Sequence, residues 1–572
     1  MLIQHLKNMF AKNYFRLLLS LFLILPSAIS GAAQNSKSNF NRFRTYDVQN
    51  YIIRVSFDRD KKTVFGDTTV QLKPLKADFN RVELDAANAM KFTSVKLENE
   101  NADLKYKTSG DKIIVDLGRN FAPSDLIALR FKYSVKPNKG VYFVDAEKAD
   151  GKTNRPAQIW SQGETEEAHY WFPSYDFPDD KAGSEEYITV EKGETAIGNG
   201  ELLDTVENAD GTKTFHFKLD VPHSVYLISF VIGDYVKISD SYKDIPLAFY
   251  MYSGTESLAQ RKYGKTKEMM RVFEELTGVA FPYNKYDQTM VANFNFGGME
   301  NITATTMADT EILMNPDSIV EDLVSHELSH SWFGDLVTCR NWAELWLNEG
   351  LATYMEAAYR EKVYGRADYL RKIRADAAEF ITDEAVNDNK HGLYNQSARP
   401  DDSIFDTTNY QKGGAVIHTL RETVGAENFW KAINIYLVRH QFQNVETADL
   451  RKAMEETSGV NLEWFFKQWV DGGGYPKLNV KQIYDPSSRQ LSLTVQQTQS
   501  GNKLTPEAFV LPMDVELTSA NGAKIEHIEI KKREETFTFK VDDAPTSIVF
   551  DKDEKIPLKT VKIQAMQTAK AK

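Results

Sequence analysis

Hydrophobic and polar residues alternate along the first part of the chain, from about Tyr46 to Asp240. Such alternation puts successive side chains on opposite faces of an extended chain, which predicts strands with one buried face. The clearest examples are YIIRVSF with Tyr51, Ile53, Val55 and Phe57, and DTTVQL with Thr68, Val70 and Leu72. YLISFVIGDY, residues 226–235, predicts a buried strand that ends in a Gly-Asp turn. We expect a β domain over residues 40–250.

The period of the apolar residues changes at about Ala259, where AQRKYGKTKEMMRVFEELTG predicts a helix that stops at Gly278. Helical patterns then continue as far as NLEWFFKQWV, residues 461–470. The following segment, DGGGYP, is rich in residues that break regular structure and predicts a linker. A mainly helical domain is therefore expected over residues 251–472.

Alternation returns after this linker, in LSLTV, MDVEL and FTFKV. Asn521-Gly522 between two of the predicted strands is typical of a hairpin turn. Several short alternating strands of this kind predict a small β-sandwich, which we place at residues 473–560. The predicted fold class is multidomain α+β, with an N-terminal β domain, a helical domain and a C-terminal β-sandwich.

The N-terminal segment has the order of a secretory signal. Lys7, Lys12 and Arg16 precede the apolar run LLLSLFLIL, and small residues follow as far as Ala33. The apolar run is too short for a comfortable membrane span. We expect residues 1–33 to be a signal peptide and the protein to be exported, either periplasmic or secreted; an uncleaved membrane anchor is the alternative.

The net charge limits the class of binding partner, and the cysteine count limits what can stabilise the fold. With 81 acidic and 69 basic residues, the formal net charge is −12, which disfavours nucleic acid because binding it needs a basic surface. No obligate membrane partner is implied. Cys339 is the single cysteine, so no disulfide can form within the chain. The chain is long enough to rely on core burial instead.

Candidate chemistry begins in PDSIVEDLVSHELSHSWFG, which predicts a helix from Pro316 to Gly334. His326 and His330 are four residues apart, so both rings project from one face and can bind one zinc ion. Glu327 points roughly a quarter-turn away, where it can reach a water beside the metal. This H-E-x-x-H pattern is typical of zinc peptidases. For the bare motif, a solvated helix face stays open as the alternative.

A third metal ligand is available on the next predicted helix, WAELWLNEGLATYMEAAYREKV, residues 342–363. Catalytic zinc usually takes three protein ligands and one water, and His-His-Glu is a recognised set. If the two helices are antiparallel, Glu349 can reach the same ion. An ordinary surface acid is the alternative for Glu349 taken alone.

These motifs resemble those of the gluzincin metallopeptidases and, more narrowly, of the aminopeptidase N and leukotriene-hydrolase family. Four further segments resemble motifs of that family in the expected order, over nearly all of the chain after the predicted signal. They are SQGETEEAHYWFPSYDFP (161–178), VPHSVYLISFVIGDY (221–235), GGMEN (297–301) and NYQKGG (409–414).

The resemblance implies a thermolysin-like catalytic domain and a role for each motif residue. One zinc ion would be held by His326, His330 and Glu349. Glu327 would be the general base and Tyr410 would stabilise the oxyanion. The free α-amine of a peptide would be bound by Glu300 and Glu164, and its backbone by Gly297 and Gly298. For each residue taken without the resemblance, another interpretation stays open. Glu300 could be a plain turn acid, and Tyr410 a core or surface tyrosine. Glu164 could belong to a solvated acidic run with Glu166 and Glu167.

The chain also departs from the family pattern. His169 stands where the family usually has arginine, Ser174 where it often has cysteine, and Phe405 where some members have a second tyrosine. The chain ends soon after the predicted sandwich, so we expect the large C-terminal helical domain of many relatives to be absent.

The sequence thus predicts a zinc-dependent aminopeptidase acting on peptides with a free N-terminus. A thermolysin-type endopeptidase is one alternative, and GGMEN argues against it. A catalytically silent binding protein is another, and the intact Glu327 and Tyr410 argue against it. The sequence leaves open the preferred N-terminal residue, the physiological substrate, the oligomeric state and any epoxide-hydrolase side activity.

Overall fold

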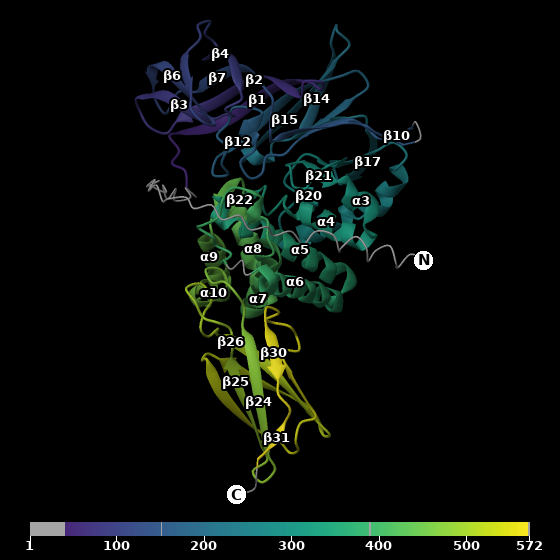
Figure 1. The fold of residues 1–572 in the computed structure, drawn as a ribbon. Coiled ribbons are helices and arrows are strands. Elements are labelled where there is room, and N and C mark those ends of the chain that lie inside the picture. Colours follow the sequence, from purple (N-terminus) through teal and green to yellow (C-terminus); the bar gives the residue numbers. More distant parts are fainter. Residues whose placement is uncertain (1–40, 150–151, 388–390, 570–572) are drawn as a thin grey trace, which may run out of the picture. The chain divides into compact units, whose positions relative to one another are not determined.

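The structure is a computed structural model that describes residues 41–149, 152–387 and 391–569 (Figure 1). The predicted signal peptide, residues 1–33, lies outside the described residues. Along the described chain a β region, a mainly helical region and a second β region follow one another, which confirms the predicted fold class. None of the helices in these ranges is long and apolar enough to cross a membrane.

The N-terminal region is built on a seven-stranded sheet. β1 and β12 run parallel, and every other neighbouring pair in it is antiparallel. The predicted buried face is confirmed, because Thr68, Val70 and Leu72 are fully buried, although Thr69 on the other face of the strand is buried as well. The strand order is β14 (Glu201–Glu207), β15 (Lys213–Ser224), β12 (Lys181–Val190), β1 (Tyr46–Asp58), β2 (Thr63–Pro74), β7 (Ile127–Val135) and β4 (Lys91–Leu97).

Three smaller sheets complete this region. One has the order β13 (Thr195–Gly198), β16 (Phe230–Gly233), β11 (Gln158–Ser161) and β8 (Val141–Val144). The others are β3 (Phe79–Asp85), β6 (Lys112–Phe121) and β5 (Lys105–Thr108), and the pair β9 (Glu147–Ala149) and β10 (Lys152–Arg155).

The strand predicted over residues 226–235 is much shorter in the structure, and this prediction was wrong in its length. Only β16 is extended, and Val225–Leu227 form a 3-10 turn. The side chain of Asn199 explains the difference, because it takes backbone groups that a strand would offer to its neighbour. It donates to the carbonyl of Leu227 at 3.1 Å and accepts from the amide of Ser229 at 2.7 Å.

The central region starts with a mixed five-stranded sheet. β18, β19 and β21 are parallel, and β20 is an antiparallel edge strand that carries part of GGMEN. The order is β17 (Val236–Tyr242), β18 (Ile245–Met251), β19 (Tyr286–Val291), β21 (Ala304–Ala308) and β20 (Gly298–Met299). Figure 1 shows β20 and β21 beside α3 and α4.

Helices make up most of the rest of the central region, together with the short parallel pair β22 (Val337–Cys339) and β23 (Gln443–Val445). The helices are α1 (Ala259–Tyr263), α2 (Thr266–Thr277), α3 (Asp309–Met314), α4 (Asp317–Ser329), α5 (Trp346–Tyr364), α6 (Arg366–Asn387), α7 (Gly413–Val424), α8 (Ala426–His440), α9 (Thr447–Ser458) and α10 (Glu463–Trp469).

Helix ends match the sequence prediction at one helix and differ at another. The single helix predicted from Ala259 to Gly278 is divided into α1 and α2, and α2 ends at Thr277 with the left-handed Gly278, at φ +68°, as its C-cap. α4 starts after Pro316 as predicted, but it ends at Ser329 and not near Gly334. Beyond His330 the chain forms tighter turns, with the amides of Ser331 and Trp332 bonded to carbonyls three residues earlier. The predicted helix was therefore too long.

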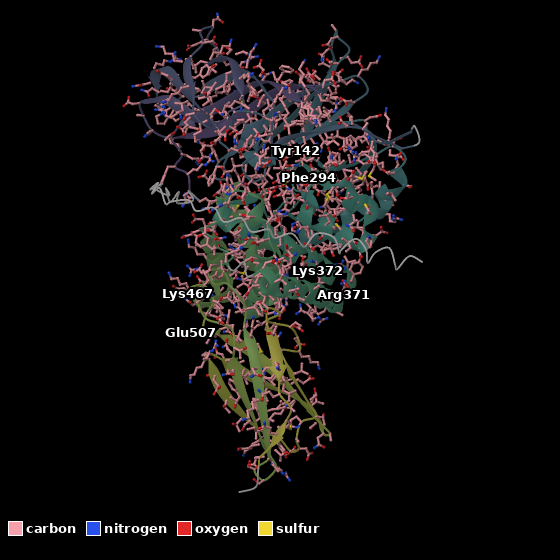
Figure 2. All side chains as sticks on the ribbon, in the orientation of Figure 1. Tyr142, Phe294, Arg371, Lys372, Lys467 and Glu507 are labelled. Carbon is pink, nitrogen blue, oxygen red and sulfur yellow. The ribbon has the colours of Figure 1, made fainter. Side chains whose placement is uncertain are left out.

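The N-terminal and central regions are joined close to GGMEN by aromatic packing. Tyr142 of β8 stacks on Trp160 of β11 with ring centroids 4.3 Å apart, and Phe294 meets the same ring at 5.4 Å (Figure 2). The indole of Trp160 also donates to the carbonyl of Ala292 at 3.1 Å. These contacts fix the segment that leads into β20.

The C-terminal region has two sheets, as a β-sandwich requires. The predicted hairpin is present, but Ser519 pairs with Gly522, so the turn residues are Ala520 and Asn521, one position earlier than predicted. One sheet contains β28 (Glu534–Lys540), β25 (Gln490–Gln497), β24 (Lys477–Asp485) and β30 (Thr560–Ile563), with β31 (Gln567–Thr568) also on β24. The other contains β27 (Gly522–Ile530), β26 (Leu511–Ser519) and β29 (Ser547–Phe550).

Candidate functional site

The structure brings the three predicted metal ligands together. His326 lies in the last turn of α4, His330 caps that helix, and Glu349 lies in the first turn of α5. Nε2 of His326 and Nε2 of His330 are 3.3 and 3.4 Å from Oε2 of Glu349. One donor atom from each residue lies within 4.8 Å of the other two, and all three residues are buried.

The other ring nitrogens are already engaged, which orients both imidazoles. Nδ1 of His330 donates to the carbonyl of Phe333 at 2.8 Å, and Nδ1 of His326 is 2.9 Å from Oε1 of Glu356. A carbonyl only accepts, so His330 carries its proton on Nδ1 and presents the lone pair of Nε2. Two imidazole nitrogens and one carboxylate oxygen form a donor set that fits catalytic zinc.

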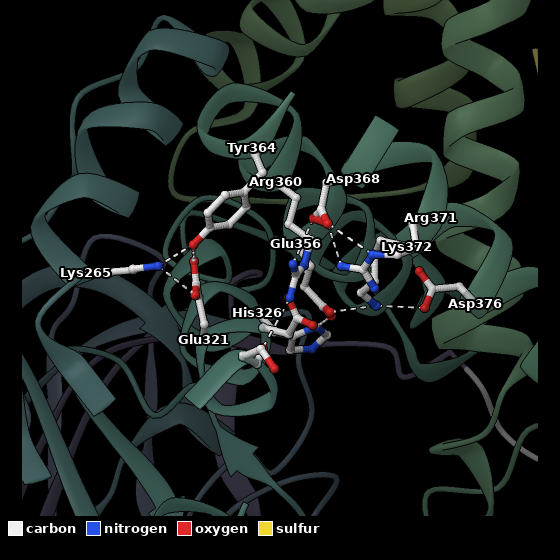
Figure 3. A network of polar contacts seen from close by, with 12 residues as sticks. Lys265, Glu321, His326, Glu356, Arg360, Tyr364, Asp368, Arg371, Lys372 and Asp376 are labelled. Carbon is white, nitrogen blue, oxygen red and sulfur yellow. Dashed lines mark hydrogen bonds and ion pairs between the residues drawn. The ribbon is translucent and has the colours of Figure 1, made fainter. Parts of the chain in front are cut away.

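Glu356 is a functional residue that the sequence analysis missed. It continues into a buried network, because its Oε2 lies 2.8 Å from Nζ of Lys372, which also contacts Asp376 at 2.7 Å (Figure 3). Lys372 and Asp376 lie on α6. A signal was present in the sequence: Glu356 follows Glu349 by about two helical turns, so both acids share one face of α5.

Burial and neighbouring charges shift the pKa values of the acidic residues of the site in opposite directions. Burial works against ionisation of Glu349, but the charges of His330 and His326 outweigh it and lower its pKa to about 2. Burial raises the pKa of Glu327 to about 8, although the same two histidines oppose the shift. Burial also disfavours charged His326, yet its hydrogen bonds to Glu349 and Glu356 raise its pKa to about 9.

Two glycines allow β20 to pass directly over Glu327. A Cβ atom on Gly298 would lie 2.3 Å from Oε1 of Glu327, far inside contact distance. A Cβ on Gly297 would lie 3.0 Å from Leu323 of α4. The carbonyl of Gly297 accepts from the amide of Ala308 at 2.9 Å, which fixes the segment to β21. The Gly-Gly pair thus holds the edge strand against the helix that carries Glu327.

Glu300 and Glu164 lie in the same cluster, with side chains that are almost fully buried. Oε1 of each has no hydrogen-bond partner among the described residues. Oε1 of Glu300 is 3.9 Å from Nδ1 of His330, and carboxylate oxygens of Glu164, Glu300 and Glu349 come within 4.8 Å of one another. Burial raises the pKa of both Glu164 and Glu300, and the charge of Glu300 adds to the shift at Glu164.

Glu164 does not belong to a solvated acidic run. The two acidic residues that follow it form ion pairs with basic side chains: Glu166 pairs with Arg42 at 2.5 Å, and Glu167 pairs with Lys139 at 2.8 Å. Only Glu164 of the three lines the cavity that contains the metal ligands.

Tyr410 reaches the site from a π-helical turn, η6 (Thr408–Lys412), that leads into α7. Its ring lies nearly parallel to that of His326, with an interplanar angle of 13° and centroids 5.7 Å apart. Close approach of α5 to this turn depends on two glycines, because a Cβ on Gly350 would be 2.9 Å from Cα of Gly413. Burial, with the charge of Glu349, raises the pKa of Tyr410 well above its usual value and keeps its hydroxyl protonated.

One cavity of about 490 Å³ is lined by the candidate metal ligands and by the other titratable side chains of the site, Glu327, Glu356, Glu300, Glu164 and Tyr410. Its apolar wall includes Phe296, Met299, Leu323 and Phe405. Phe405 stands where some relatives have a second tyrosine, so it offers no second hydroxyl to the cavity. The cavity is large enough for a residue of a small peptide.

Comparison with known families assigns all three regions. Residues 261–469 match the peptidase family M1 domain, and residues 46–227 match the peptidase M1 N-terminal domain. Residues 474–552 match a domain of unknown function with an Ig-like fold.

Three proteins to which the chain is similar are named aminopeptidases. The chain is 28% identical to aminopeptidase 2 of Candida albicans over 420 residues, 70% of this chain and 45% of that protein. It is 32% identical to aminopeptidase N of Streptomyces lividans over 334 residues, 56% of this chain and 38% of that protein. Identity to glutamyl aminopeptidase of Bos taurus is 30%, over 58% of this chain and 36% of that protein. The chain therefore matches less than half the length of these relatives.

Proposed function

Because the chain belongs to peptidase family M1, we propose that it is a zinc-dependent aminopeptidase that removes the N-terminal residue from peptides. In this proposal His326, His330 and Glu349 hold one zinc ion. The observation that carries the aminopeptidase assignment is the pair of buried, unpartnered carboxylate oxygens of Glu164 and Glu300.

Unpartnered oxygens in a buried site are costly unless a ligand satisfies them. A protonated α-amine supplies both the opposite charge and three donors, so it suits two converging carboxylates. Binding the amine there holds the first peptide bond at a fixed place relative to the metal ligands. A substrate without a free amine would leave both carboxylates unpaired, which favours an exopeptidase over an endopeptidase.

Each remaining residue of the site has a role suited to its position. A zinc ion held by His326, His330 and Glu349 would lower the pKa of a water beside it and polarise a substrate carbonyl. Glu327, buried beside His326 and lining the same cavity, takes a proton from the attacking water and returns it to the leaving amine. The protonated hydroxyl of Tyr410 donates to the oxyanion that forms during attack.

The proposal extends to substrate and location. Peptides with a free N-terminus are the expected substrates, and no nucleic acid is expected because of the net charge of −12. Export to the periplasm or the exterior is supported by the charged, apolar and small-residue order of residues 1–33.

The test is a panel of aminoacyl and peptide substrates in paired free and N-acetylated forms. We expect the free forms to be cleaved, the acetylated forms to be nearly inert, and a chelator to abolish activity until zinc is restored. Equal cleavage of both forms would favour the thermolysin-type endopeptidase. No cleavage of any substrate by the zinc-loaded protein would favour the silent binding protein.

Tyr410→Phe separates catalysis from binding. Loss of one oxyanion donor costs about 10²- to 10³-fold in kcat, with little change in KM, because the donor meets charge only in the transition state. If KM alone rises, Tyr410 binds the ground state and has no oxyanion role.

A further inference from the structure

The turn that carries Tyr410 is held at its start by Asp406. Oδ1 of Asp406 accepts from the amides of Thr408 and Asn409, both at 3.0 Å. The carbonyl of Asp406 also accepts from the amide of Tyr410 at 3.2 Å. Three successive amides of the turn are thus bonded to one residue, so the position of Asp406 sets the position of Tyr410.

The second carboxylate oxygen of Asp406 is held by a histidine. Nε2 of His391 lies 2.5 Å from Oδ2 of Asp406, and Nδ1 of His391 lies 2.7 Å from the carbonyl of Gly392. Both ring nitrogens therefore face oxygen acceptors. These two contacts hold the imidazole in place between Asp406 and Gly392.

His391 is itself fixed by close backbone packing against the linker that follows α10. A Cβ on Gly392 would lie 2.6 Å from the carbonyl oxygen of Val470 and 2.5 Å from that of Asp471. The far end of the Tyr410 turn is tied to the same stretch, because buried Lys412 donates to the carbonyl of Gly472 at 2.7 Å. Both ends of the turn are thus braced on residues 470–472.

We propose that His391 is a positioning residue for Tyr410, which acts by holding Asp406 and through it the turn that aims the phenol at the reacting carbonyl. This inference rests on the proposed aminopeptidase function. His391 is not among the described residues that line the cavity, so it acts without touching the substrate. Asp406 does line the cavity, which makes His391 the cleaner position to change.

The role predicts a particular kinetic signature. A misplaced Tyr410 weakens transition-state binding only, so His391→Ala should lower kcat about ten- to a hundredfold and change KM less than about twofold. In a Tyr410→Phe background the same change should have almost no further effect, because two residues that act through one interaction are not additive. His391→Gln, which keeps one donor for Asp406, should recover part of kcat.

The experiment measures kcat, KM and zinc content for the wild type, His391→Ala, His391→Gln, Tyr410→Phe and the double variant His391→Ala with Tyr410→Phe. His216→Ala is the matched control. Its side chain is 13% exposed against 15% for His391, and it also pairs with carboxylates, but it lies on β15 of the N-terminal sheet. We expect zinc content to be unchanged throughout and His216→Ala to keep normal kcat.

Three outcomes would overturn the inference, and they differ in what else they remove. If Tyr410→Phe lowers kcat but His391→Ala and His391→Gln do not, or if the His391 and Tyr410 effects multiply in the double variant, His391 does not act through Tyr410 and the aminopeptidase proposal stands. If Tyr410→Phe keeps normal kcat, the oxyanion role of Tyr410 fails and the positioning role fails with it.

Discussion

The two sides of the cavity treat buried charge in opposite ways. On the α4–α5 side, both metal-facing histidines have a second partner on the other ring nitrogen: Glu356 for His326 and the carbonyl of Phe333 for His330. On the side formed by β20 and the segment after β11, Glu300 and Glu164 are also buried, yet each keeps one oxygen with no hydrogen-bond partner in the described part of the chain.

The two sides therefore differ in whether their buried polar groups already have hydrogen-bond partners. A polar group that is already paired needs nothing more, and its pairing fixes the direction of the remaining lone pair. A buried oxygen without a hydrogen-bond partner raises the free energy of the folded protein. A cationic ligand that donates to this oxygen would remove that penalty and bind more tightly for it. The α4–α5 side suits a metal ion that stays bound, and the side with Glu300 and Glu164 suits a ligand that binds and is released.

The largest effect is expected at Glu327, which lies between the two sides. Glu327→Gln keeps the shape that packs against Gly298 but cannot take a proton, so kcat should fall about a thousandfold while zinc is retained. Measurement of kcat and of zinc by atomic absorption checks this. Glu186→Gln is the control, because burial also raises the pKa of Glu186 to about 8 but it lies in the N-terminal sheet. A Glu327→Gln variant with near-normal kcat would remove Glu327 from the mechanism.

The second-largest effect on activity is expected at Glu300, on the side where carboxylate oxygens lack hydrogen-bond partners. Glu300→Gln removes one charge that faces the substrate amine, and losing one member of a buried charge pair costs about 2–5 kcal/mol. We expect kcat/KM for free peptides to fall about a hundredfold, with little change for acetylated ones. Added zinc should not restore it. If the ratio between free and acetylated substrates stayed the same, Glu300 would not be the amine site.

The paired side should respond in the opposite way. Glu356→Gln weakens the partner of His326, and loss of such a partner costs about 10- to 100-fold in metal affinity. The purified variant should contain less zinc, and excess zinc should recover its activity. Zinc titration against a competing chelator measures the affinity. Activity that stays low at saturating zinc would mean that Glu356 does more than orient the ligand.

The smallest effect should come from the contact between α5, on the paired side, and the turn that carries Tyr410. Gly350→Ala places a methyl group against the backbone of Gly413, so α5 and the Tyr410 turn must separate. Overpacking of this kind costs about 1–3 kcal/mol. Thermal unfolding should show a Tm lower by several degrees, with a modest loss of kcat. An unchanged Tm would show that the helices can shift freely at this point.

Local sequence signals were enough for the elements of the site and part of its chemistry. Helical spacing put His326 and His330 on one face, and alternation gave both β regions. Errors arose where side chains or later strands compete with a local pattern. Asn199 ends the strand predicted over residues 226–235, and tight turns before β22 end α4 early.

What the sequence by itself determined is therefore short-range: the fold class, the helix with its two histidines and the candidate Glu349. Tyr410 became a candidate only through the resemblance to a known family. Tertiary structure alone decided that Glu164 leaves its acidic neighbours for the cavity, that Glu356 supports His326, and that His391 reaches Asp406. The physical reason is that periodicity reports which face of an element a residue occupies. Partners far apart along the chain are chosen by packing and by pairing of buried charge, which no local pattern records.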